Sequence, residues 1–332
     1  MRGRALVTGG AGFIGSHVCD AYLADGWEVT ALDDLSAGKR ENVPPGAAFA
    51  HLDIRSPELC DLLLEGQFDL VNHHAAQVDV RVSVARPRED ASINVDGFLN
   101  VLEASRQAGV ARVVYISSGG VVYGEADDLP VEETREKGPL SPYGVSKLAG
   151  EHYLYYYRVV HGMTSVALRY ANVFGPRQDP HGEAGVVAIF ARRALRGQQL
   201  IVYGDGEQTR DYVYVKDVAQ ANLLAATLEL PGSGSLDDFA FNVGTGRETS
   251  VNELARRTAE FSGRELDVKR EPARPGELLR SALDVRKLRA AGWSPAFSLE
   301  EGLAETYGWV AESEGADSEG AESEGAESEG GA

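Results

Sequence analysis

A glycine-rich turn near the start of the chain constrains the fold more than any other feature. A short apolar run at residues 4–8 leads into the sequence VTGGAGFIG, which opens a helical pattern at residues 12–25. Glycines at the G-x-G-x-x-G spacing allow a tight turn and let a pyrophosphate approach the backbone at a helix N-terminus. The motif therefore predicts a strand–turn–helix unit that binds a dinucleotide. The residues expected to contact this cofactor are Gly9, Gly12, Phe13, Ile14 and Gly15.

An acidic residue, Asp33, closes the second predicted strand at residues 28–33. A carboxylate at this point of a dinucleotide-binding unit accepts hydrogen bonds from the adenosine ribose hydroxyls, and it repels a 2′-phosphate. The sequence therefore favours NAD over NADP as the cofactor.

The first half of the chain alternates short apolar runs with helical patterns, which is typical of a parallel sheet with helices on both faces. Strands are predicted at residues 4–8, 28–33, 68–74, 111–118 and 164–170. Helices are predicted at residues 12–25, 57–65 and 85–108, and again from Ser141. The predicted fold class is α/β, with a doubly wound parallel Rossmann sheet.

After about residue 175 the alternation loosens, and helical patterns follow at residues 186–197, 216–230, 250–262 and 299–310. We therefore predict an NAD-binding domain at residues 1–175 and a smaller α/β substrate-binding domain at residues 176–310. Residues 311–332 repeat Ser-Glu-Gly-Ala units and contain eight acidic residues, no basic residue and no large apolar one. Such a segment cannot bury enough surface to offset its ordering entropy, so a disordered acidic tail is predicted.

Composition excludes several classes of function. The net charge of −19 argues against a nucleic-acid partner. No apolar run approaches the ~18–20 residues that span a bilayer, so no membrane association is predicted. The two cysteines support neither a disulfide framework nor a metal site, so no metal is expected and the cytoplasm is the predicted compartment.

A tyrosine and a lysine lie one helical turn apart in the sequence SPYGVSK. Ser141 is a good helix cap and Pro142 suits the first helical position, so Tyr143 and Lys147 share one face of the predicted helix. A free tyrosine has a pKa of about 10 and is a poor base. A neighbouring ammonium and a nicotinamide cation would both stabilise the phenolate, which could then take a proton from a sugar hydroxyl.

Together these motifs resemble a known family. The segments TGGAGFIG, LDDLSAGKREN, NHHAAQ, ISSGGVVYGE, SPYGVSK, LRYANVFGPRQDPHGEAGVVAIF and YGDGEQTRDYVYVKDVAQAN look like the extended short-chain dehydrogenase/reductases. Within that group, the NAD-dependent epimerase/dehydratase family, the chain is most similar to UDP-galactose (UDP-glucose) 4-epimerases. The similarity extends from about residue 2 to residue 310.

The resemblance implies roles for further residues. It makes Tyr143 and Lys147 the catalytic pair. The additional cofactor-binding residues that it implies are Asp53, Ile54, Ala75, Ala76, Asn94 and Tyr170. The residues that it assigns to the UDP part of the substrate are Asn172, Arg210, Arg274 and Glu277. Two arginines are well suited to a diphosphate, because the guanidinium fork forms charge-assisted bonds with it.

One position departs from the family pattern. Most members have a serine or threonine four residues before the tyrosine of the VYG segment, and here that position is Gly119. We expect Ser118 to supply the catalytic hydroxyl instead, and Ser117 is the alternative.

The implied activity is NAD-dependent 4-epimerisation of UDP-glucose and UDP-galactose through a 4-keto sugar. The resemblance places Ser281 and Gly185 at two pocket-lining positions, and because both residues are small it implies a pocket that also admits UDP-GlcNAc and UDP-GalNAc. Another nucleotide-sugar modifier, such as a UDP-glucuronate decarboxylase or epimerase, and a non-catalytic protein that binds NAD and a UDP-sugar both stay open as alternatives. By analogy with the family, helices near residues 85–108 and 142–160 are expected to form a homodimer interface.

Overall fold

The computed structural model describes residues 2–180, 185–263, 267–273 and 278–328. At its centre lies a seven-stranded sheet with the order β11-β6-β5-β4-β1-β2-β3, in which every neighbouring pair is parallel. These strands are β1 (Arg4–Thr8), β2 (Glu28–Asp33), β3 (Ala48–His51), β4 (Leu70–His73), β5 (Arg112–Ser118), β6 (Thr164–Tyr170) and β11 (Ala240–Val243). The predicted doubly wound α/β fold is confirmed, with all five predicted strands in the sheet.

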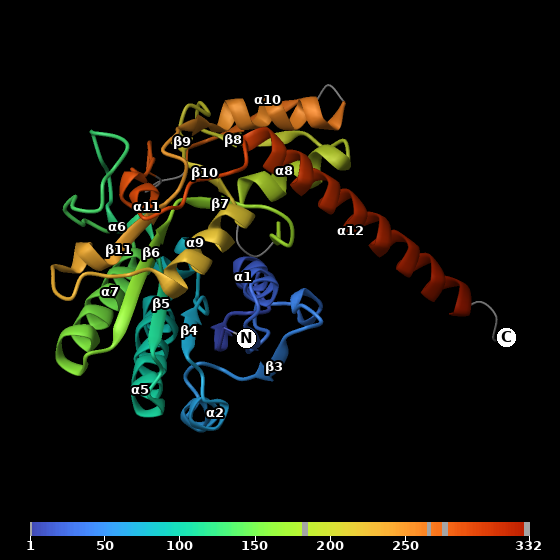
Figure 1. The fold of residues 1–332 in the computed structure, drawn as a ribbon. Coiled ribbons are helices and arrows are strands. Elements are labelled where there is room, and N and C mark those ends of the chain that lie inside the picture. Colours follow the sequence, from blue (N-terminus) through green and yellow to red (C-terminus); the bar gives the residue numbers. More distant parts are fainter. Residues whose placement is uncertain (1, 181–184, 264–266, 274–277, 329–332) are drawn as a thin grey trace.

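Helices cover both faces of this sheet (Figure 1). On one face, α1 (Phe13–Ala24) packs against α9 (Val215–Thr227), and Tyr22 and Val218 share one apolar core with the strands. On the other face, α2 (Glu58–Gly66), α5 (Phe98–Ala108) and α7 (Pro142–His161) share a second core. Strands buried on both faces need this double cover, which is why their sequences are almost continuously apolar.

The segment predicted as a single helix at residues 85–108 is divided in three. It consists of α4 (Pro87–Ala91), a π-helical stretch η2 (Ser92–Gly97) and α5. A short helix that the sequence did not predict, α3 (Val80–Ala85), precedes it, and the side chain of Asp79 caps that helix by accepting from two backbone N–H groups. π-helical turns of this kind are frequent at functional sites.

The smaller second part lies above the carboxyl ends of the strands (Figure 1). Its helices are α8 (Val186–Leu195), α10 (Val251–Ser262), α11 (Arg286–Ala290) and α12 (Leu299–Ser328). Its strand pairs are β7 (Asn172–Phe174) with β10 (Tyr212–Tyr214), β8 (Leu200–Tyr203) with β13 (Val268–Glu271), and β9 (Thr209–Arg210) with β12 (Thr249–Ser250). Three short segments complete the list of elements, namely η1 (Arg40–Asn42), α6 (Gly119–Val122) and η3 (Leu236–Phe239).

Two elements that follow the predicted division at residue 175 pack with the large sheet or its helices. Strand β11 pairs with β6 at one edge of the large sheet, and α9 packs on α1, although both follow residue 175 in the chain. The first domain therefore also contains elements from the second half of the sequence. The reason is that sheet pairing joins strands far apart in sequence, which local periodicity does not reveal.

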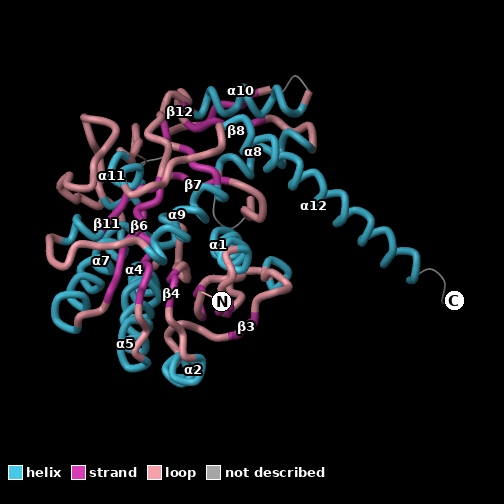
Figure 2. The backbone as a smooth tube through the Cα atoms, in the orientation of Figure 1, coloured by secondary structure: helices cyan, strands magenta, loops and turns pink. Residues whose placement is uncertain are grey.

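Helix α12 continues through most of the segment predicted to be a disordered tail, and it extends away from the rest of the molecule (Figure 2). Glu314, near the start of that segment, forms ion pairs with Arg192 and Arg196 of α8. The boundary predicted at residue 310 is therefore a few residues too early, because the helix is still in contact with α8 at Glu314. Throughout the part of the chain that the structure describes, no helix is both long and apolar enough to cross a membrane.

Candidate active site

The start of α7 has the predicted cap. Ser141 Oγ accepts a hydrogen bond from the N–H of Gly144 at 3.2 Å, and Pro142 occupies the first turn. Tyr143 and Lys147 therefore lie one turn apart on a helix of fixed start, as the sequence predicted.

Lys147 is almost completely buried, with 3% of its surface exposed. Its Nζ donates to the carbonyl of Ile116 on β5 at 3.0 Å, and it lies 5.8 Å from the ring centroid of half-buried Tyr143. Burial lowers the pKa of Lys147 to about 8, although the carboxylate of Asp90 acts in the opposite direction. The ammonium is thus held rigidly beside the Tyr143 phenol.

The glycine turn forms a cradle that no larger residue could replace. Gly9 has φ +70°, and a Cβ there would lie 2.7 Å from the backbone N of Ala75. A Cβ on Gly15 would lie 2.1 Å from the carbonyl oxygen of Gly9. Helix α1 begins after Gly12 without a side-chain cap, so its first N–H groups face the turn. These observations fit a bound pyrophosphate, and hence NAD, at this helix N-terminus.

Asp33 lies at the end of β2, beside the same turn. Its carboxylate accepts hydrogen bonds from the N–H groups of Ala11 at 3.0 Å and Leu35 at 2.9 Å. A Cβ on Gly38 would lie 2.8 Å from Asp33 Oδ1, so the loop can approach the carboxylate this closely only with glycine there. Burial raises the pKa of Asp33, against the effect of its two backbone hydrogen bonds. Its position next to the cradle fits the predicted contact with the adenosine ribose.

The predicted adenine contacts lie in the loop after β3. Ile54 is buried beneath Gly97, whose Cβ would lie 2.7 Å from the Ile54 side chain. Asp53 forms an ion pair with Arg55 and remains partly exposed, and the hydrogen bonds of that guanidinium lower the pKa of Asp53. The Asp53 carboxylate is thus at the surface, where Arg55 already holds it.

Asn94 is buried and holds a loop in place. Its side-chain amide accepts from the N–H of Gln77 and donates to the carbonyl of the same residue, both at 2.9 Å. The same loop carries Ala75, whose N–H donates to Thr8 Oγ1 at 3.2 Å, and Ala76. Because the polar groups of Asn94 are engaged here, its described contacts fix the shape of the predicted cofactor-lining loop.

Tyr170, another predicted cofactor-binding residue, ends β6 and is buried. Its hydroxyl accepts from Asn222 Nδ2 at 2.6 Å, in a buried network that also contains Tyr22 and Asn72. Burial raises the pKa of Tyr170 well above 10. The hydroxyl is therefore directed into the core, and the contact of Tyr170 with NAD remains a prediction for its ring and backbone.

The two serines at the end of β5 point to different surroundings. Ser117 is buried, and its Oγ donates to Glu151 Oε1 at 2.5 Å. Ser118 is half-buried and lies at the start of α6. An ideal Cβ on Gly120 would lie 3.8 Å from Ser118 Oγ and 3.9 Å from Asn172 Oδ1, so both polar groups border the same space. This arrangement favours Ser118 over Ser117 as the catalytic hydroxyl.

Gly119 cannot carry the hydroxyl of the common pattern. A Cβ there would lie 2.5 Å from the side chain of Leu283, which is 1% exposed and packed against Val122 and Val131. The glycine is thus required by the packing of Leu283.

The predicted substrate residues fall in the second part of the molecule. Asn172 begins β7 and is exposed, while Arg210 ends β9 and is half-buried, with its Nη1 donating to the carbonyl of Thr209 at 2.8 Å. Ser281 is 9% exposed. Arg274 and Glu277 lie outside the described residues.

Gly185 has a close neighbour at its predicted pocket-lining position. A Cβ on Gly185 would lie 2.4 Å from Gln178 Nε2, so the end of the Gln178 side chain lies next to this glycine. The contribution of Gly185 to a sugar pocket stays a prediction.

Several buried charged residues were missed by the sequence analysis. Glu151 of α7 is ion-paired with Arg169 of β6, and Asp90 of α4 is fully buried. The signal was present, because Glu151 follows Lys147 at a spacing of four on the buried face of the helix, and Arg169 interrupts an apolar strand. Asp211, next to Arg210, accepts from Thr245, Gly246 and Leu283 and so fixes the base of the second part.

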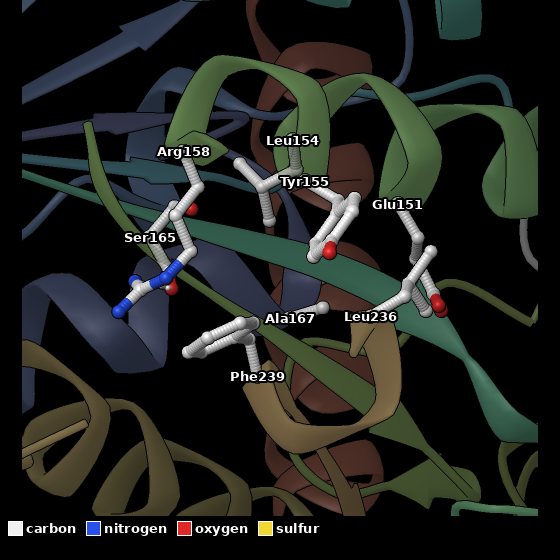
Figure 3. A pocket seen from close by; sticks show the side chains of 8 residues that line it. All are labelled: Glu151, Leu154, Tyr155, Arg158, Ser165, Ala167, Leu236 and Phe239. Carbon is white, nitrogen blue, oxygen red and sulfur yellow. Dashed lines mark hydrogen bonds between the residues drawn. The ribbon is translucent and has the colours of Figure 1, made fainter. Parts of the chain in front are cut away.

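A small hollow of about 10 Å³ lies between α7, β6 and η3, and Glu151 is one of the side chains that line it (Figure 3). Such a volume holds at most about one water molecule, so it is no substrate site. Among the described residues no cluster of three histidine, cysteine or acidic side chains could hold a metal ion.

Comparison with known proteins agrees with this geometry. Residues 5–244 match the NAD dependent epimerase/dehydratase family. The chain is 45% identical to the UDP-glucose 4-epimerase of Mycolicibacterium smegmatis over 91% of this chain and 97% of that protein. Two solved structures are also similar. The UDP-glucose 4-epimerase of Thermus thermophilus in complex with NAD has a TM-score of 0.86 at 47% identity, covering 92% of this chain and 98% of its own.

The UDP-glucose 4-epimerase of Thermotoga maritima with UDP-glucose has a TM-score of 0.88 at 44% identity, covering 93% of this chain and 99% of that one. The family match covers most of the chain, and these identities extend over nearly its whole length. The chain therefore belongs to the NAD dependent epimerase/dehydratase family.

Proposed function

We propose that the protein is an NAD-dependent 4-epimerase that interconverts UDP-glucose and UDP-galactose. The observation that carries the proposal is the buried ammonium of Lys147 beside Tyr143, on a sheet whose glycine turn fits NAD. Relatives that share this architecture at 44–47% identity are named for the same reaction. The two cysteines are free thiols, which agrees with the proposed cytoplasmic location.

The residues of the site have distinct roles in the proposed reaction. The charge of Lys147 stabilises Tyr143 as the phenolate, which accepts the proton of the sugar 4-hydroxyl and becomes a neutral phenol. The glycine turn and Asp33 would hold NAD, which would supply reversible hydride transfer at C4, so no second redox substrate would be consumed. Ser118 holds the 4-oxygen near Tyr143. At the end of the cycle Tyr143 returns the proton to this oxygen.

The position of Ser118 suits this role. The segment that follows it packs on α7, since a Cβ on Gly144 would lie 3.0 Å from the carbonyl oxygen of Val121. Asn172 borders the same space as Ser118, and we propose that Asn172 and Arg210 contact the diphosphate of the substrate. Arg274 and Glu277 complete the proposed substrate contacts.

We also propose a homodimer in which the outer face of α7 meets its equivalent in a second copy. Large apolar side chains are exposed there, with exposed fractions of 54% for Val145, 47% for Tyr156 and 58% for Val160. Leu154 and Tyr157, on the inner face of the same helix, are buried in the core. Helix α7 thus has a packed face and an exposed apolar face, and apolar patches of the latter kind are typical of interfaces.

Removing the phenol hydroxyl tests the catalytic base. Tyr143→Phe should fold and retain NAD but lose UDP-galactose epimerisation by at least ~10²-fold, the usual scale for a general base. The measurement is conversion of UDP-galactose to UDP-glucose without added cofactor, with bound NAD quantified after denaturation. Wild-type turnover in the variant would exclude Tyr143, and an unmodified enzyme that converts only UDP-glucuronate would favour the alternative nucleotide-sugar modifier. If no UDP-sugar is converted, the result would favour the non-catalytic protein that binds NAD and a UDP-sugar.

The two serines give a matched pair of variants. Ser118→Ala should lower kcat by at least ~10-fold with unchanged NAD content, since it removes a bond to the reacting oxygen. Ser117→Ala should instead lower the melting temperature, because it withdraws a hydrogen bond from the buried Glu151 carboxylate. The reverse pattern would assign the catalytic hydroxyl to Ser117.

Sugar selectivity tests the predicted pocket at Ser281. The wild-type kcat/KM for UDP-GlcNAc should lie within about tenfold of that for UDP-glucose, and Ser281→Tyr should selectively reduce the former, because a clash discriminates more strongly than added room. The end of the Gln178 side chain lies next to Gly185. Of the two small residues, we therefore expect Ser281 to provide the room for the acetamido group. Rejection of UDP-GlcNAc by a thousandfold or more in the wild type would contradict this prediction.

The dimer can be tested in solution. Tyr156→Asp combined with Val160→Asp should convert a dimer into a monomer, since each places a charge in the proposed apolar contact. The molar mass by light scattering is the measurement. Leu64→Asp, on α2 and 49% exposed, is the control that should leave the mass unchanged. A wild-type monomer would disprove the proposal.

A further inference from the structure

A buried carboxylate outside the predicted catalytic set lies next to the Tyr143–Lys147 helix. Asp90 of α4 has no exposed surface. Its Oδ2 accepts from Ser146 Oγ of α7 at 2.6 Å, and its Oδ1 accepts from Gln77 Nε2 and Asn94 Nδ2, both at 3.0 Å. All three donors are neutral, so these bonds satisfy the oxygens without cancelling the charge.

The hydrogen-bond partners of Asp90 connect two parts of the site. Gln77 and Asn94 fix the loop after β4 that carries the predicted cofactor-lining alanines, whereas Ser146 directly precedes Lys147 on α7. Asp90 therefore joins the NAD-binding loop to the helix of the catalytic pair.

Apart from Tyr143, the proposed base whose ring centroid lies 5.8 Å from Lys147 Nζ, and the ion-paired Glu151, the other titratable side chains around Lys147 are neutral at working pH. Burial, followed by the charge of Lys147, lowers the pKa of His74 to about 3, and it lowers the pKa of His73 well below 6.5. Burial raises the pKa of Tyr115, whose ring centroid lies 5.3 Å from Lys147 Nζ, well above 10. Glu151, one turn further along α7, is ion-paired with Arg169. Asp90 thus remains as the negative charge that acts on Lys147 among these neighbours.

We propose that Asp90 is a positioning residue that keeps Lys147 protonated inside an apolar site and couples that charge to the NAD-binding loop. The proposal rests on the proposed function, because the ammonium matters only if Tyr143 is the base. A buried lysine loses its proton more easily than an exposed one. A fixed opposite charge restores the ammonium form, and neutral donors leave that charge available.

The sign of the effect follows from the lowered pKa of Lys147, about 8. Loss of the negative charge at position 90 lowers this pKa further, so the ammonium is lost at a lower pH. Activity that needs the ammonium then falls earlier as the pH rises. The attraction between residues 90 and 147 also stabilises the folded state only below the pKa of Lys147, and it vanishes above it.

The test uses Asp90→Asn, which has the shape of the native residue. The new amide can still accept from Gln77 and Asn94 and can donate to Ser146, whose hydroxyl rotates to accept. The control is Ser146→Ala, which removes one bond to Asp90 but leaves its charge. In the holoenzyme, the alkaline limb of the kcat profile should move down by about one pH unit in Asp90→Asn and stay in place in Ser146→Ala.

A second measurement does not depend on activity. The difference in melting temperature between Asp90→Asn and wild type should change in favour of the variant from pH 7 to pH 9.5, as Lys147 becomes neutral in both. The difference for Ser146→Ala should stay constant. Loss of epimerase activity in the wild type would reject the proposed function but leave this measurement intact.

Three results would overturn the proposal. The first is that in Asp90→Asn the alkaline limb of the kcat profile stays at the wild-type pH and the difference in melting temperature from wild type does not change with pH. The second is an equal shift in Ser146→Ala, which would assign the effect to geometry. The third is a uniform loss of kcat at every pH, which a merely structural residue would give. If Asp90→Asn does not fold, Asp90→Ser removes the same charge with a smaller side chain and is judged by the same outcomes.

Discussion

The ion pair between Glu151 and Arg169 holds the catalytic helix on the sheet. Both side chains are buried, with 1% and 0% exposed, and the shortest contact is 2.6 Å. Ser117 of β5 adds a hydrogen bond to the same carboxylate, so α7 is fixed to two neighbouring strands. Removing one partner of such a pair costs about 3–5 kcal/mol, because it leaves a buried charge uncompensated. The position of α7 on the sheet, and therefore the position of Tyr143 relative to Ser118, depends on this pair.

The buried charges near α7 are compensated in two different ways. Glu151 is balanced by Arg169, which also binds Asp237 and the hydroxyl of Tyr123. Burial by itself would lower the pKa of Arg169, but the hydrogen bonds that its guanidinium donates to Glu151 outweigh burial and raise that pKa. The donors to Asp90 among the described residues, Gln77, Asn94 and Ser146, are neutral. They leave its negative charge available to act on Lys147. One carboxylate therefore anchors the helix, while the other sets the charge state of its lysine.

Much of this site could be predicted because its signals are local. The glycine turn, Asp33 and the Tyr143–Lys147 spacing each lie within one strand–helix unit, so the periodicity of the sequence is enough to place them. Strand β11 and helix α9 pack with the same sheet but follow more than 35 residues of intervening chain. No local sequence pattern shows that the chain returns to this sheet. The close approach of the Gln178 side chain to Gly185 is likewise a contact between neighbours in space that the residue types do not specify.

Gly119 shows how such a contact alters a motif. Read from the sequence, the glycine is a missing hydroxyl. In the structure, Leu283 from the second half of the chain packs where a side chain at position 119 would begin. A serine at 119 would therefore require the side chain of Leu283 to shift from its packed position. With Leu283 in place, the hydroxyl has to come from a residue whose side chain points elsewhere. Ser118 ends β5 and borders the same space as Asn172, which is why we propose Ser118, and not the following turn, as the source of the hydroxyl.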